Sequence, residues 1–132
     1  MKTIFSLLLV VMLLPGCGES KQDNQALYDD VMKVHDEVMP RMDDIYSLKV
    51  NLKKQAADSS SLTDDRRKAI EAAILKLDAA SEGMMVWMRN FNPLPDSLGE
   101  EKARLYLEEQ QKQIENVRAD MQAAIDEATA LK

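Results

Sequence analysis

The chain has 132 residues with 17 basic and 23 acidic side chains, which gives a net charge of −6. This length suits a single domain, and the acidic balance argues against nucleic-acid binding, which needs a basic face. One Cys excludes an intramolecular disulfide and every motif that needs several Cys ligands, and an aromatic content of 5% leaves the core to aliphatic residues and Met.

The N-terminus has the pattern of a cleavable secretory signal. Lys2 supplies a positive charge, and residues 4–14 are apolar apart from Ser6. A helix of this length is too short to cross a bilayer core of about 30 Å, whereas it suits the apolar region of a signal peptide. Residues 1–16 are therefore predicted to be a signal peptide.

The signal ends in Leu14-Pro15-Gly16-Cys17, which resembles the lipobox of bacterial lipoproteins. The resemblance implies cleavage after Gly16, with acyl chains such as palmitate on the sulfur and the new amine of Cys17. Several acyl chains anchor a protein stably where one chain does not. The alternatives are an ordinary secretory signal that ends near a Cys, or an uncleaved chain with a buried thiol.

A lipid on Cys17 implies a place in the bacterial cell envelope, with the membrane as a partner. Gly18 follows the Cys, where lipoproteins retained at the inner membrane of enterobacteria have Asp. The outer membrane is therefore favoured over the inner membrane. Residues 17–24 are predicted to form a polar tether between the lipid and a folded domain at residues 25–132.

The folded domain is predicted to be all-α, with helices at about residues 25–56, 63–91 and 98–131. Apolar side chains recur there at alternating three- and four-residue steps, a spacing typical of coiled-coil seams. The predicted seam positions are Tyr28, Val31, His35, Val38, Met42, Ile45 and Leu52, then Ile70, Ile74, Leu77, Ser81, Met84, Met88 and Phe91, then Ala103, Leu107, Gln110, Ile114, Val117, Met121, Ala124, Ala128 and Leu131.

Polar and proline residues divide these segments. The polar residues 58–61 interrupt the period, and Thr63 is a good helix N-cap. Pro93 and Pro95 cannot continue the second helix, and Pro40 is expected to kink the first helix without ending it. Two short connections of this kind predict an antiparallel three-helix bundle.

The positions of the connections also predict which residues face one another. Turns centred near residues 59 and 95 place His35 opposite residue 83, and Gln110 opposite residue 80 or 81. His35, Ser81 and Gln110 are therefore expected to form one buried polar layer. The same pairing gathers Tyr28, Trp87, Phe91 and Tyr106 at the end nearest the tether.

The composition offers little catalytic chemistry. With one His, the chain cannot supply the two Glu-x-x-His pairs of a di-iron bundle. Ser81 lies in a predicted helix without the elbow motif of a nucleophilic Ser, and His35 lies on a core seam. The expected protein is therefore not an enzyme, and it has no cofactor apart from the lipid on Cys17.

One cluster leaves a second reading open. The predicted pairing brings His35 near five Met residues, and thioethers with an imidazole can hold copper or haem iron. Met is also a common filler of cores and of adaptable binding surfaces. The candidate ligands of this alternative are Met32, His35, Met39, Met84, Met85 and Met88.

Three stretches of the chain resemble a family of small helical lipoproteins from Bacteroidota that often carry the label "viral A-type inclusion protein". They are HDEVMP at residues 35–40, MMVWMRNF at residues 84–91, and Tyr106-Leu107 with Gln111, Ile114 and Val117. The resemblance covers nearly the whole mature chain and implies a lipid-anchored helical bundle. It implies no activity and no site residues.

Taken together, the sequence predicts a lipid-anchored envelope protein that acts as an interaction or structural module, with a possible protein partner. Copper or haem binding through His35 and the Met cluster is the alternative.

Overall fold

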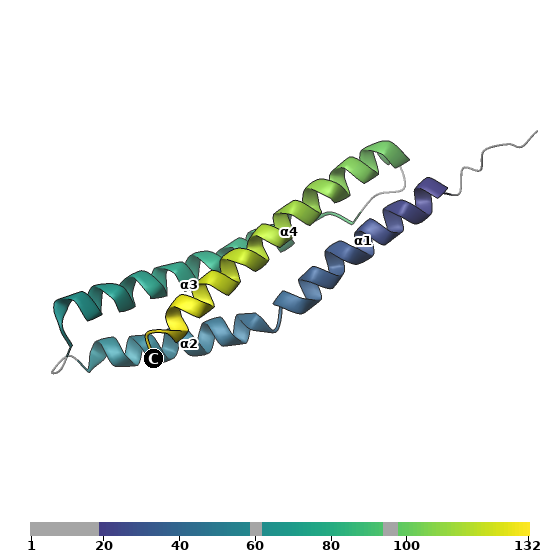
Figure 1. Ribbon diagram of the computed structural model, residues 1–132. Helices are drawn as coiled ribbons and strands as arrows, with labels where there is room; N and C mark the ends of the chain where they lie inside the picture. The colour runs from purple at the N-terminus through teal and green to yellow at the C-terminus, as the bar shows by residue number, and fades with distance from the viewer. Residues whose placement is uncertain (1–18, 59–61, 94–97) are drawn as a thin grey trace, which may run out of the picture.

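The computed structural model describes residues 19–58, 62–93 and 98–132. All regular elements in these residues are α-helices, which confirms the all-α prediction: α1 (Glu19–Val38), α2 (Arg41–Ala57), α3 (Asp64–Asn90) and α4 (Glu100–Thr129). Figure 1 shows α1 and α2 following one another along one arm, α3 returning beside α2, and α4 running in the direction of α1 and α2. None of these helices is long and apolar enough to cross a membrane.

The first predicted helix is interrupted at Pro40, where a kink in a continuous helix was expected. The Met39 amide still donates to the His35 carbonyl at 2.9 Å, but Pro40 has no N–H to donate in the next position. A turn therefore separates α1 from α2, and the Met42 amide donates to the Met39 carbonyl at 3.1 Å. Pro40 precedes α2 with helical dihedral angles, φ −61° and ψ −23°.

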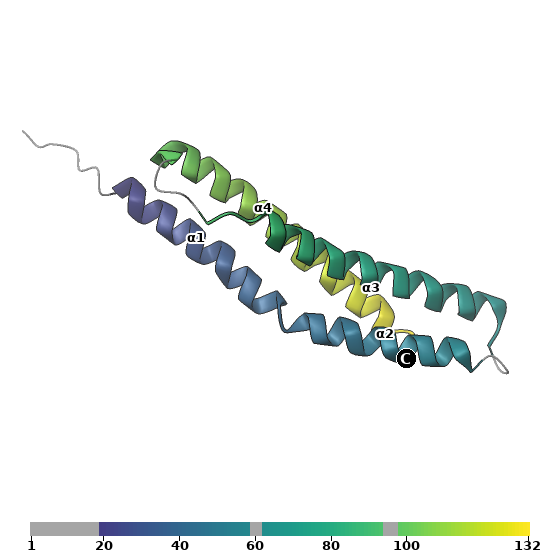
Figure 2. The same ribbon diagram turned by 180° about the vertical axis from the view of Figure 1, so that it is seen from behind.

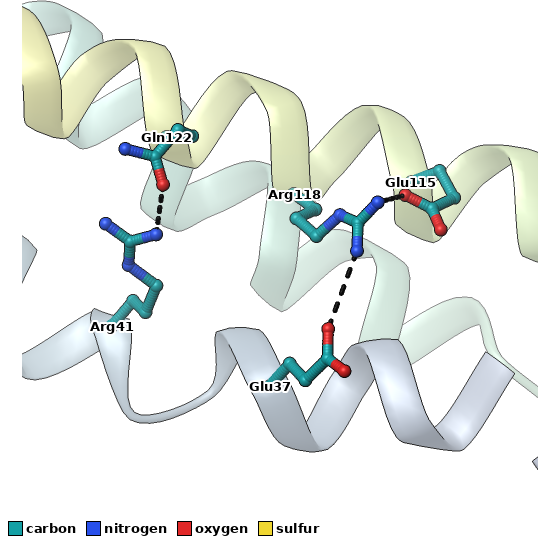
Figure 3. A network of polar contacts seen from close by, with 5 residues as sticks. All are labelled: Glu37, Arg41, Glu115, Arg118 and Gln122. Carbon is teal, nitrogen blue, oxygen red and sulfur yellow. Dashed lines mark hydrogen bonds and ion pairs between the residues drawn. The ribbon is translucent and has the colours of Figure 1, made fainter. Parts of the chain in front are cut away.

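Polar contacts with α4 hold both sides of this break (Figure 3). Arg118 of α4 lies 3.5 Å from Glu37 of α1 and 2.5 Å from Glu115 of its own helix. Beyond the break, Arg41 donates to Gln122 of α4. Exposed pairs of this kind contribute at most about 1 kcal/mol each. Glu37 and Arg41 are four residues apart, and so are their partners Arg118 and Gln122. The residue numbers therefore increase in the same direction on both sides, which shows that α4 runs parallel to α1 and α2.

The predicted tether is part of the first helix from residue 19 onward. Asn24 is buried, and its Nδ2 donates to the backbone carbonyl of Glu100 at 2.9 Å. This stretch has no Pro or Gly after Gly18, so nothing in its sequence prevents helix formation. The bundle consequently begins two residues after Cys17.

Ion pairs show which residues of α3 lie beside its neighbours. Lys49 of α2 pairs with Asp78 of α3, and Lys76 of α3 pairs with Glu127 of α4. The predicted N-cap is present, because the amide of Arg66 donates to Thr63 Oγ1 at 3.3 Å. Figures 1 and 2 both show α4 starting beyond the end of α3.

The core agrees closely with the predicted seam in α4 and only in part in α3. The buried α3 residues include Ala73, Ala80 and Trp87, whereas the expected Ile74, Ser81 and Met88 are half-buried. In α1 and α2, Val34 and Leu48 join the core, and Tyr28 and His35 are only half-buried. Both α1–α2 and α3 are thus rotated slightly from the predicted orientation.

We predict that Pro40→Ala lowers the free energy of unfolding by about 0.4–1 kcal/mol, measured by urea denaturation. Ala can adopt the native dihedral angles of Pro40, so the loss arises from the greater freedom of the unfolded chain. Pro40→Gly, the control, should lose more because glycine is freer still. A gain of about 3 kcal/mol on Pro40→Ala would instead indicate a proline strained inside a continuous helix.

Candidate functional site

Aromatic side chains from three helical arms meet at the end of the bundle where α1 and α4 begin. The Phe91 ring lies 4.8 Å from Trp87, 6.1 Å from Tyr28 and 6.3 Å from Tyr106, measured between centroids. The structure thus brings together the four residues of the predicted aromatic cluster, Tyr28, Trp87, Phe91 and Tyr106. The amide of Asn92 donates to the Tyr106 hydroxyl at 2.8 Å, which ties the residues after α3 to α4.

His35 lies beside this aromatic cluster. Its ring centroid is 5.9 Å from that of Trp87, and its Nδ1 lies 2.9 Å from the Asp36 carboxylate. The side chain is 21% exposed. His35 therefore packs against Trp87, one turn beyond the predicted position opposite residue 83.

The structure does not bring His35, Ser81 and Gln110 together as one layer. Ser81 precedes Trp87 by six residues, which is about 9 Å along α3. The ion pair of Lys76 with Glu127 sets α3 and α4 in a register that places Gln110 opposite about residue 93, between one and two turns beyond Trp87. Within the described residues, no hydrogen bond joins any two of the three predicted members.

The reason lies in the connection between α3 and α4. A tight turn around residue 95 would place Gln110 opposite Ser81. Instead, the backbone at Phe91 is extended, with φ −67° and ψ 119°, and α4 starts beyond the end of α3 (Figure 2). A turn around residue 95 would also place Lys76 opposite residue 114, whereas Lys76 pairs with Glu127. The pairing of α3 with α4 is therefore displaced by about 13 residues, which is between three and four turns.

Two buried polar atoms in this half of the bundle have no hydrogen-bond partner. They are Trp87 Nε1, a donor, and Gln110 Oε1, an acceptor, in residues that are 4% and 7% exposed. An unpaired buried polar atom costs about 1–3 kcal/mol. Sequence reasoning selected both residues but gave no signal for the unpaired atoms, because their orientation depends on the packing of α3 against α4.

The predicted Met and His ligands lie in different environments. Met84 is fully buried in the core, whereas its neighbour Met85 is 39% exposed on another face of α3. Met32, Met39 and Met88 are half-buried. Adjacent residues on a helix point about 100° apart, so Met84 and Met85 do not face one common centre.

The described residues contain no group of three or more His, Cys, Asp or Glu side chains that could hold a metal ion. The lipobox residues Leu14, Gly16 and Cys17 lie outside the described residues. No family model, curated protein or solved structure matches this chain.

Gln110→Leu should raise the free energy of unfolding by about 1–2 kcal/mol. The substitution removes the unpaired Oε1 and adds apolar surface in a buried position. Gln113→Leu is the matched control, because Gln113 is exposed on the same helix and its replacement should change stability by less than about 0.5 kcal/mol. A loss of stability in Gln110→Leu would mean that the amide is hydrogen-bonded in solution.

Proposed function

We propose that this chain is a lipid-anchored protein of the bacterial cell envelope that acts as a non-enzymatic interaction or structural module. Its proposed shape is an antiparallel three-helix bundle with coiled-coil-like seams, in which α1 and α2 together form the first arm. It belongs, in this proposal, with the small helical lipoproteins that its sequence resembles.

The observation that carries the proposal is the start of α1 at Glu19, two residues after Cys17. Two extended residues span at most about 7 Å. An acyl group on Cys17 would therefore hold the first turn of α1 next to the bilayer. The bond from Asn24 to the carbonyl of Glu100 would keep the start of α4 at the same end.

The side chains that could carry catalysis have other roles in the bundle. His35 packs on Trp87 and bonds Asp36, and Ser81 lies about 9 Å along α3 from the level of that histidine. Most of the remaining polar residues are exposed on the outer faces of the helices. These features support a role that depends on surfaces rather than on a reaction centre.

The proposed location is the outer membrane, since Gly18 follows the anchoring Cys. The partners in this proposal are the membrane and a protein of the envelope.

Cys17→Ala tests the anchor, because only the thiol can accept the diacylglyceryl group. The variant should lose radioactive palmitate labelling and should no longer partition into the detergent phase. Gly18→Ala keeps the thiol and serves as the control, with labelling retained. Labelling of the Cys17→Ala protein, or a wild-type intact mass without acyl groups, would contradict the proposal.

A further inference from the structure

The first turns of α1, residues 19–27, are held against the bundle by less apolar surface than the rest of that helix. Among residues 21–27 the one buried residue is Asn24, which is polar. Tyr28, by contrast, contacts Phe91 with 6.1 Å between the ring centroids. The residues of α1 that follow and join the core are Val31, Val34 and Val38. The apolar attachment of α1 therefore begins at Tyr28.

Asn24 occupies a position where an apolar residue would continue the core. It precedes Tyr28 by four residues and so lies on the same face of α1. Its Nδ2 donates to the backbone carbonyl of Glu100 at 2.9 Å, and such a bond stabilises less than the burial of a Leu side chain. Ala103 and Leu107 of α4 are buried but lie outside the continuous core. This end of the bundle is thus separate from the core that holds the other helices together.

Acidic side chains meet where this segment faces the start of α4. One depression there is lined by Asp23 and Asn24 of α1 and by Glu100, Glu101 and Arg104 of α4. Arg104 is the one basic residue among these. Carboxylates that face one another oppose the packing of this part of α1 on α4, although the effect is modest at exposed positions.

We propose that residues 19–27 detach reversibly from α4 while α1 stays in the bundle from Tyr28 onward, and that the bond from Asn24 to Glu100 is the contact that opens. Nine residues span about 14 Å as a helix and about 30 Å when extended. Release would let the bundle move up to about 15 Å farther from the point where the chain enters the membrane. This change of reach rests on the proposed anchor, whereas the release itself needs no lipid.

The first test follows amide hydrogen exchange by mass spectrometry in the full lipidated chain in detergent. Amides of residues 23–27 should exchange at least about tenfold faster than those of residues 31–38, because local opening exposes them without unfolding the rest of α1. The comparison starts at residue 23, since the first four amides of a helix have no partner within it.

Substitutions at Asn24 should change this exchange in opposite directions. Asn24→Ala removes the bond to Glu100 and should speed the exchange of residues 23–27 about three- to tenfold, although Ala is the better helix former. Asn24→Leu continues the apolar face and should slow it at least about threefold. Gln22→Ala is the matched control, because Gln22 is exposed on the same segment and should stay within about twofold of wild type.

The second test measures the reach of the bundle in lipid vesicles. Cys17 is the only Cys, so once it is acylated a dye reacts only with a Cys introduced at an exposed site by Ser47→Cys. Energy transfer from this dye to acceptor lipids should be lower when Asn24→Ala is added and higher when Asn24→Leu is added.

Equal protection of residues 23–27 and 31–38 would overturn the proposal. Equal effects of Gln22→Ala and Asn24→Ala, or faster exchange in Asn24→Leu, would also overturn it. Unchanged energy transfer in acylated Asn24 variants would overturn the change of reach. An intact mass without acyl groups would refute the anchor alone, because the exchange measurements decide the release with or without a lipid.

Discussion

The missing N–H of Pro40 is the constraint on which the arrangement of the first arm depends. A continuous helix would keep one face toward the same neighbours along its whole length. The break lets the arm change direction, so that α1 lies mainly against α4 while α2 contacts both α3 and α4. The buried apolar residues of both parts join the common core, and the exposed contacts of Glu37 and Arg41 with α4 add little to this packing.

Large side chains fill the space between α1, α4 and the C-terminal part of α3. Phe91 and Trp87 occupy this space together with Tyr28, and His35 packs against the indole. Large rings are harder to fit than aliphatic side chains without leaving polar atoms unpaired. Trp87 Nε1, within this cluster, is left without a hydrogen-bond partner, and so is Gln110 Oε1 on α4.

Local patterns in the sequence determined the helical class, the N-cap at Thr63 and most of the α4 core, because period and capping depend on neighbouring residues. The gathering of the aromatic rings also followed, since large rings tolerate an error in register. The sequence did not predict which residues of α4 lie opposite Ser81. That register differs from the predicted one because the backbone leaves α3 in an extended conformation at Phe91. Only the tertiary structure decided that Ala80 rather than Ser81 faces the core, since the rotation of α3 is set by its close approach to α4.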